Sequence, residues 1–309
     1  MFFKNLVIFS LPDDWRISPA ELEEKLKTHT LLPCNQASAQ SRGWVAPVAG
    51  SGLVYDSGLQ MLIALGTESR LLPGAVIRKE LDQRGKDLEQ KQGFAPGRKQ
   101  LRDLKDQVVT ELLPKAFIRD KVSRAWIDLE RHRIVVDSTT AKAAEELMTV
   151  LRNDLGSLEA VPLSVKDTTA NVLQAWLLAA DVPGEIFDLE HDCELVGLGQ
   201  EAVRYVSHAL DTAEIRAQVA QGKSCSRIGL LWRDRVHLVL TSGLQIKRLA
   251  PAAISAEPAV EKAADEKLDF EATFTLMCGE YGLLISELVA LFGGLAEEEK
   301  PKEELPEAA

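Results

Sequence analysis

Basic side chains concentrate in one segment of an otherwise acidic chain. Residues 78–124 hold thirteen Lys and Arg against eight Asp and Glu, so the segment carries +5 in a 309-residue protein of net charge -11. Such residues bind anions, and the commonest large anion for a local positive surface is nucleic acid. Eleven of them are the candidate DNA-binding residues: Arg78, Lys79, Arg84, Lys86, Lys91, Arg98, Lys99, Arg102, Lys105, Lys115 and Arg119.

Three of these candidates have the spacing of one helix face. Arg98, Arg102 and Lys105 are separated by four and three residues, which aligns them as a stripe. Leu101 and Leu104 belong to a separate apolar face, which predicts that the helix packs against something. Basic helix faces are common, so the charge pattern alone is also compatible with a solvated face that binds nothing.

The acidity of the chain is concentrated near its C-terminal end. Residues 250–309 hold fourteen acids and four bases, a balance of -10, and the preceding 249 residues hold 33 acids and 32 bases. An acidic total usually argues against nucleic-acid binding. Here the acidic region leaves the rest of the chain free to present a basic surface.

Two glycine-containing segments match nucleotide-binding loops only in part. The sequence QGKS at residues 221–224 resembles the end of a phosphate-binding loop, but Ala217 occupies the position of its first glycine. Residues 197–202 fit GxGxxA, but a strand rather than a helix is expected to follow. We therefore predict that Gly222 ends a helix and that residues 197–202 form a hairpin turn.

No arrangement of residues indicates catalysis. The five His and four Cys show no metal-ligand spacing, and no GxSxG or HExxH sequence occurs. We expect no catalytic residue, no metal and no cofactor. Widely spaced cysteines predict reduced thiols and a cytoplasmic protein, and no stretch approaches the roughly 20 apolar residues of a membrane span.

Two helices are expected to position the basic residues. Residues 75–92 and 98–113 favour helix, the sequence GFAPG at 93–97 separates them, and Pro114 ends the second. Other helices are predicted from Ser18 and at 139–152, 212–221 and 261–292. Strands are predicted at 3–11, 44–48, 61–65, 125–129, 133–137, 160–163, 193–198, 202–206, 227–232, 236–241 and 245–249.

The irregular mixture of strands and helices indicates the α+β class. Residues 1–73 and 122–185 form the predicted central α+β domain, 74–121 with 261–295 a helical subdomain, and 186–250 a β-rich subdomain. A linker is expected at 251–260 and a disordered acidic tail at 296–309. Trp44, Trp126 and Trp232 lie within apolar strands, which favours the core over a base-stacking surface.

The order of several short sequences resembles the RdgC family of bacterial recombination-associated proteins. No single one is a catalytic fingerprint, but their order and spacing are specific and span nearly the whole chain. They are FKNLVIF at 3–9, GWVAP at 43–47, LLPKAF at 112–117, WID at 126–128, VVDSTTAKAAEE at 135–146, LRNDLGSLEAVPLS at 151–164 and MCGE at 277–280.

The resemblance implies a ring-shaped, nucleoid-associated homodimer that encircles double-stranded DNA without sequence preference and without enzymatic activity. It implies that the ring limits the access of the recombinase RecA to DNA, and that Phe117 lies at one of two contacts closing the ring. A ring needs Lys and Arg on its inner wall but no base-reading helix, which agrees with the basic segment. Single-stranded DNA is a further candidate ligand.

Two alternatives remain open. Phe117 follows a helix-ending proline, and we expect it to protrude, although it could instead pack under its own helix. The whole basic segment could also belong to a non-enzymatic protein-interaction module whose helices bind an acidic partner.

Overall fold

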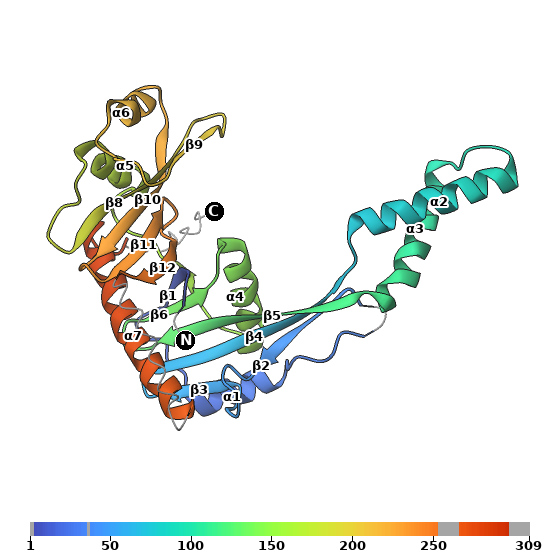
Figure 1. Ribbon diagram of the computed structural model, residues 1–309. Helices are drawn as coiled ribbons and strands as arrows, with labels where there is room; N and C mark the ends of the chain where they lie inside the picture. Colours follow the sequence, from blue (N-terminus) through green and yellow to red (C-terminus); the bar gives the residue numbers. More distant parts are fainter. Residues whose placement is uncertain (1–2, 36–37, 253–265, 297–309) are drawn as a thin grey trace, which may run out of the picture.

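The computed structural model describes residues 3–35, 38–252 and 266–296. In these ranges it has seven α-helices and one sheet of twelve strands, which confirms the α+β class (Figure 1). Pro251, expected to open the linker, is the last residue of a strand. Residues 253–260 of that linker, and residues 297–309 of the predicted tail, lie outside the described residues.

The strands are β1 (Leu6–Ser10), β2 (Gln40–Val45), β3 (Val54–Ser57), β4 (Gln60–Leu71), β5 (Phe117–Asp128), β6 (Arg133–Asp137), β7 (Val161–Pro162), β8 (Phe187–Val196), β9 (Ala202–Tyr205), β10 (Ser224–Trp232), β11 (Val236–Thr241) and β12 (Ile246–Pro251). The helices are α1 (Pro19–Lys27), α2 (Gly74–Gln92), α3 (Arg98–Leu112), α4 (Ala141–Leu155), α5 (Thr169–Ala179), α6 (Ala213–Ala220) and α7 (Glu266–Leu291), with a 3-10 turn at Leu113–Lys115.

Local signals located most of these elements. Ser18 caps α1 as predicted, because its hydroxyl accepts a hydrogen bond from the Glu21 amide at 3.2 Å. The sequence missed β3 and α5, and it predicted only the inner halves of β4 and β5. The strands predicted at 44–48 and 193–198 overlap only the last residues of β2 and β8. The outer half of β5 is largely exposed on both faces, so it lacks the apolar alternation that identifies a strand.

The sheet has apolar cores on both faces. Its strand order is β2-β4-β5-β6-β1-β12-β11-β10-β8-β9, with β3 on β4 and β7 on β1, all antiparallel. Along β1, Leu6 and Ile8 join one core with α5 and α7, whereas Val7 and Phe9 join the other with α1 and α4. The period of two therefore sorts apolar side chains into two layers.

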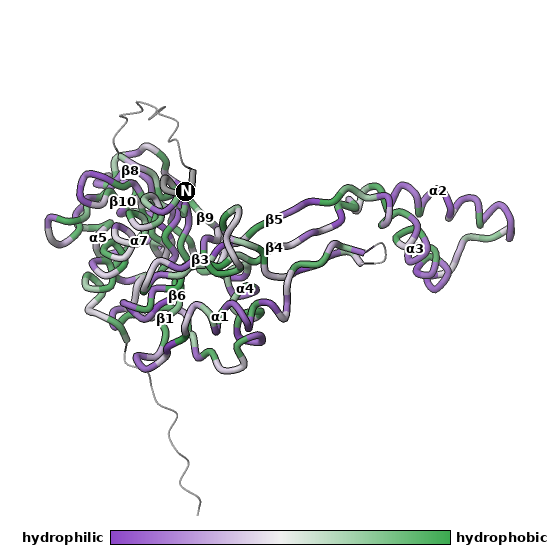
Figure 2. Tube along the Cα trace, turned by 90° about the horizontal axis from the view of Figure 1, so that it is seen from below, coloured by the Kyte–Doolittle hydropathy of each residue, from purple (hydrophilic) through white to green (hydrophobic). Residues whose placement is uncertain are grey.

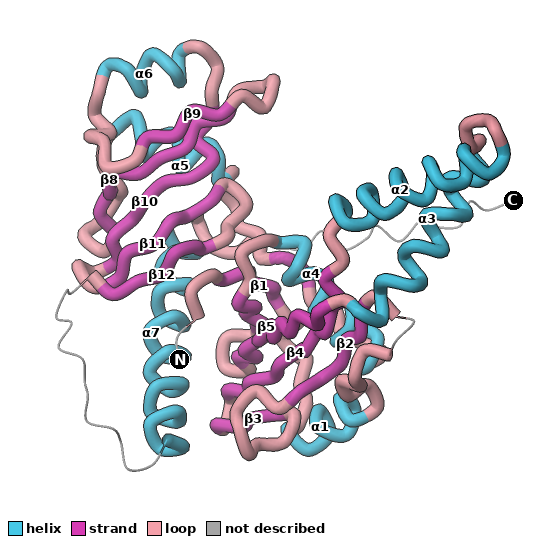
Figure 3. The backbone as a smooth tube through the Cα atoms, turned by 45° about the vertical axis from the view of Figure 1, so that its right-hand side comes forward, coloured by secondary structure: helices cyan, strands magenta, loops and turns pink. Residues whose placement is uncertain are grey.

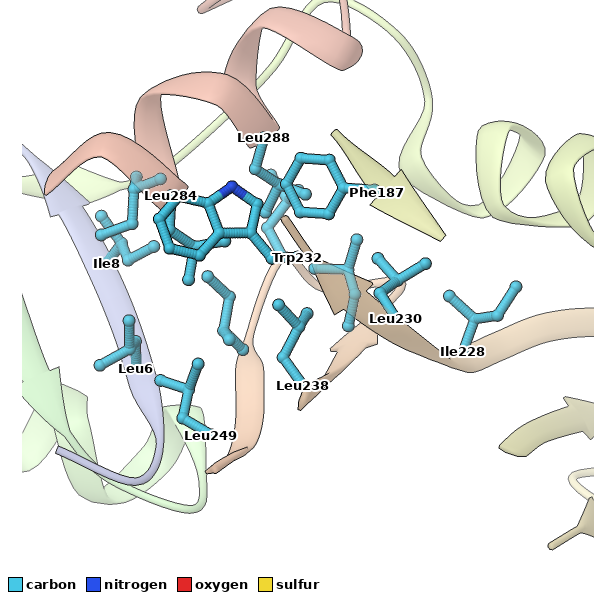
Figure 4. Close-up of a cluster of buried hydrophobic side chains, with 14 of the residues drawn as sticks. Leu6, Ile8, Phe187, Ile228, Leu230, Trp232, Leu238, Leu249, Leu284 and Leu288 are labelled. Atoms are coloured by element: carbon cyan, nitrogen blue, oxygen red, sulfur yellow. The ribbon is translucent and has the colours of Figure 1, made fainter. Parts of the chain in front are cut away.

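Trp232 lies within the larger core. Figure 4 shows its ring among side chains from β1, β8, β10, β11, β12 and α7. Trp44, Trp126 and Trp232 are at most 1% exposed, which confirms their predicted place in the core.

Helix α7 packs on the sheet and is separated from the basic helices with which the sequence grouped it. Phe274, Met277, Leu284 and Leu288 are at most 2% exposed and belong to the core with α5. Figure 1 shows α2 and α3 at the far end of an arm instead. An apolar helix face shows that the helix is covered, but it does not show by which element.

Helix α7 corrects the expectation that no stretch of the chain approaches the length and apolar character of a membrane span. Within the described residues, Phe270–Leu291 is long and apolar enough to cross a bilayer by length and composition. Its buried face packs on the sheet, so the apolar side chains of that face belong to a protein core. Leu276 and Leu283, on the other side of the helix, are exposed.

A buried ion pair ties α7 to the sheet. Asp128 is fully buried and Arg133 is 6% exposed. Arg133 Nε lies 3.1 Å from Asp128 Oδ2, and its Nη2 donates to the Gly282 carbonyl of α7 at 2.8 Å. Burial lowers the pKa of Arg133, and Asp128 opposes that shift. The pair therefore holds two charges out of water with their hydrogen bonds satisfied.

We expect Arg133→Met to lower the free energy of unfolding by about 3 kcal/mol, because Asp128 would stay buried without its main partner. Breaking a buried ion pair usually costs about 3–5 kcal/mol. Arg131 lies 3.6 Å from Asp128 and still offers it a positive charge, so we expect a loss near the lower end of that range. Denaturant unfolding at fixed protein concentration measures it. Arg131→Met is the control, with an expected loss under about 1 kcal/mol. Equal losses for both variants would contradict the assignment.

Candidate nucleic-acid interface

A long two-stranded arm carries the basic helices. β4 and β5 pair continuously from Gln60 opposite Asp128 to Leu71 opposite Phe117. Their inner halves contribute to the two apolar cores. Their outer halves project away from these cores, and β2 pairs with β4 along part of this projection. Figure 2 shows α2 and α3 beyond the end of this arm, with α2 mainly hydrophilic. The helices are therefore displayed on a support and are not covered by the body.

The two basic helices form a hairpin with its own small apolar contact. The Gly93 backbone is left-handed (φ 81°) where α2 ends, and the Gly97 amide donates to the Gln100 side chain at 2.9 Å where α3 begins. A Cβ added to Gly85 would lie 3.9 Å from the Leu101 side chain. Val108 is fully buried. The helices thus pack through one face and leave the others free, as predicted for α3.

Arg70 connects the base of this hairpin to the arm. Its guanidinium donates to the carbonyls of Leu113 and Pro114 at 3.3 and 3.2 Å, and to that of Cys34 at 3.2 Å. These bonds satisfy carbonyls at the end of α3. Arg70 was not among the candidates from the sequence, because its partners are distant in the chain.

Ten of the eleven candidate DNA-binding residues are exposed. Among the described residues none of these ten forms an ion pair, so their charges are available to a ligand. Arg98, Arg102 and Lys105 are all exposed along α3, as the stripe requires.

Arg84 differs from the other ten. It is half-buried, and it pairs with Glu80 at 2.9 Å and with Glu111 of α3 at 2.7 Å. The hydrogen bond that Arg84 donates to Glu111 lowers the pKa of Glu111. The bonds that Arg84 donates to Glu111 and Glu80 raise its own pKa. Arg84 therefore joins α2 to α3 in this structure.

Two hollows gather other basic residues. One, of about 380 Å³, lies on α2 and includes Arg78, Lys79 and Lys86 in its lining. The other, of about 370 Å³, lies between the arm and α4 and includes Arg119, Lys121 and Arg42. The set of candidates omitted Lys121 and Arg42. The two-residue spacing of Arg119 and Lys121 would have suggested one strand face had β5 been predicted at full length.

Phe117 is the first residue of β5 and is 85% exposed. The expectation that it protrudes is thereby confirmed, and packing beneath its own helix is excluded. Its cross-strand neighbour Leu71 is 47% exposed. The contact that Phe117 would make across a ring stays a prediction.

The two glycine motifs have the conformations predicted for them. α6 ends at Ala220, Gly222 has a φ of 90°, and β10 follows from Ser224, so the order is helix, turn, strand. Residues 197–202 connect β8 to β9, and the Gly197 amide donates to the Glu201 carbonyl at 2.9 Å. Neither segment leads from a strand into a helix, as a nucleotide-binding loop does.

Comparison with known proteins identifies the family. A family model described as "RdgC: Putative exonuclease, RdgC" matches residues 1–295. The chain is 38% identical to a recombination-associated protein RdgC of Dechloromonas aromatica over 97% of this chain and all of that protein. It is 37% identical to one of Janthinobacterium over 96% of this chain and 99% of the relative. The chain belongs to the RdgC family.

Membership in the RdgC family makes this a recombination-associated protein by relationship. The family description contains the word exonuclease, whereas the names of the two relatives mention only recombination. Within the described residues no group of three or more His, Cys, Asp or Glu side chains is placed to hold a metal ion.

Proposed function

We propose that the protein binds double-stranded DNA without sequence preference, as a homodimer whose two subunits close into a ring around the duplex. In this proposal the ring acts at the nucleoid and limits the access of RecA to DNA. One observation carries the proposal. A projecting arm ends in a helical hairpin whose exposed basic side chains have no ion-pair partner among the described residues.

Backbone recognition fits this arrangement better than base recognition. Cations on α2, α3 and β5 are spread over several elements and can each contact a phosphate. Arg84 is assigned to holding the hairpin together, and the other ten candidates, with Lys121, are assigned to phosphate contacts. Phe117 is proposed as one of the contacts between subunits, because an aromatic ring so exposed can be buried by a partner.

The alternative is a protein-interaction module whose basic hairpin binds an acidic protein. Binding of unrelated duplexes distinguishes the two, because contacts to phosphates do not depend on base sequence. We expect similar affinities for several unrelated duplexes, falling steeply as salt rises. Failure to bind any duplex at low salt would refute the proposal. Solution mass, with binding to circular and linear duplexes of one sequence, tests the ring.

We also expect no enzymatic activity. Lys223 follows the turn after α6 and donates to Gln218 at 2.6 Å, not into a phosphate-binding loop. Purified protein should therefore neither hydrolyse ATP with DNA present nor shorten end-labelled duplexes with Mg²⁺ or Mn²⁺. DNA-stimulated ATP turnover that disappears in Lys223→Ala would overturn this expectation, as would shortening of the duplex that follows the protein through purification.

A further inference from the structure

A basic hollow of about 300 Å³ lies in the part of the sheet formed by β8 to β12. Asn5, just before β1, and Thr139, just before α4, complete its lining. Side chains of these strands such as Ile228, Leu230 and Leu238 belong to the core that they share with α5 and α7. In Figure 3, α5 lies behind the strands β8 to β12, α7 runs downward from behind β12, and the face of these strands toward the viewer carries no helix.

The lining holds more positive than negative charge. Four cations, Arg204, Arg227, Lys247 and Arg248, stand against two carboxylates, Asp192 and Glu194, which leaves a surplus of +2. Glu194 forms ion pairs with two of the cations, Arg204 at 2.5 Å and Arg227 at 3.3 Å. Arg248 lies 3.9 Å from Asp192. Lys247 has no carboxylate within ion-pair distance among the described residues.

Irregularities in the sheet place these cations together. Between β8 and β10, Cys225 pairs with Leu195 but Arg227 pairs with Glu194, so one residue of β10 is extra. Between β11 and β12 the register also shifts beside Lys247. Arg248, in that shift, has a left-handed backbone with φ 57°. Bulges redirect side chains, and strained positions of this kind gather at binding sites.

The pKa of Lys247 agrees with a place for an anion beside it. Burial and then the charge of Arg227 lower the pKa of Lys247, and Glu194 only partly offsets them. An anion in the hollow would favour the charged form of Lys247 and relieve its repulsion by Arg227.

We propose that this hollow binds the phosphate group of a nucleotide, either free or as one unit of a DNA strand. Guanidinium groups match the oxygens of phosphate, and about 300 Å³ is room for more than a bare anion. Val206 and Val239, also in the lining, offer apolar surface to a sugar or base. In its DNA-strand form the inference rests on the proposed DNA-binding function, whereas in its free-nucleotide form it does not.

The test compares full-length wild type with the double variant Lys247→Gln and Arg248→Gln, which leaves both ion pairs of Glu194 in place. Arg216→Gln with Lys223→Gln removes the same charge from α6 and the turn after it, outside the hollow. Calorimetry measures binding of deoxyadenosine monophosphate, with deoxyadenosine as the ligand lacking phosphate. Fluorescence anisotropy measures the binding of two unrelated duplexes, and circular dichroism verifies that each variant is folded.

We expect the hollow variant to lose on the order of tenfold in affinity for the monophosphate, the duplexes or both, because hydrogen bonds between charged groups are strong. The control should lose less than about threefold. Loss for the monophosphate alone identifies a free nucleotide, and loss for the duplexes identifies a strand phosphate. If wild type binds no duplex but the hollow variant still loses affinity for the monophosphate, the proposed DNA-binding function is wrong and the inference of a phosphate site in the hollow is supported. Unchanged affinity for both ligands, or an equal loss in the control, overturns the inference.

Discussion

Replacing Arg98, Arg102 and Lys105 with Glu is expected to weaken binding to every duplex by at least about tenfold. These three cations form an exposed stripe along α3, and each lost phosphate contact should reduce the salt dependence by up to about one unit of slope. The effect should be the same for unrelated sequences, because phosphates carry no sequence information. Anisotropy titrations at several salt concentrations give both the affinity and the slope.

The substitutions should leave α3 folded. Glu favours helix about as well as Arg and Lys do, and an acid at the first helical position, Arg98, interacts well with the helix dipole. A matched control places three Glu on other helices, at Lys25, Lys27 and Arg216, which are also exposed. The control should bind DNA nearly as wild type does. Equal weakening in both variants would show that net charge, and not the stripe, governs binding.

The arm shows where sequence reasoning succeeded. Helix propensity, the glycines of GFAPG and Pro114 are local signals, and they located α2 and α3 within one residue at each end. The exposure of Phe117 followed from the same proline. The support was missed because the outer halves of β4 and β5 bury neither face fully, and a strand without a buried face has no period-two pattern.

Contacts between distant segments could not be predicted in the same way. The sequence predicted the C-terminal helix and grouped it with the basic helices, and only the fold shows that α7 packs on the sheet. Arg70 reaches carbonyls near residues 34 and 113, and nothing near Arg70 in the sequence indicates them. The hollow of Arg227 and Lys247 depends on register shifts between strands, which residue types do not encode locally.

Phe117→Ala is expected to weaken dimerisation roughly thirtyfold or more while leaving the subunit folded. Loss of a buried core Phe costs about 3–5 kcal/mol, but the Phe117 side chain is 85% exposed, so its removal should hardly change the unfolding of the monomer. An aromatic residue that anchors an interface contributes about 2 kcal/mol or more to association. Sedimentation equilibrium over a range of protein concentrations measures the dissociation constant.

DNA binding should fall along with dimerisation, although every basic residue of the arm remains. A ring that opens more readily releases its duplex more readily, and the difference should be greatest on circular DNA, which offers no free end. Thermal unfolding is compared at one protein concentration, because dissociation alone lowers the apparent stability of a dimer.

Phe94 provides the matched control. It lies in the turn between α2 and α3 and is 62% exposed, so Phe94→Ala removes the same side chain from the same arm. Phe94→Ala should keep the dimerisation constant and the DNA affinity of wild type. A Phe117→Ala protein that unfolds outright would show that the Phe117 side chain supports the fold of the subunit. A Phe117→Ala protein that dimerises and binds DNA as well as Phe94→Ala does would show that Phe117 is not part of the contact between subunits.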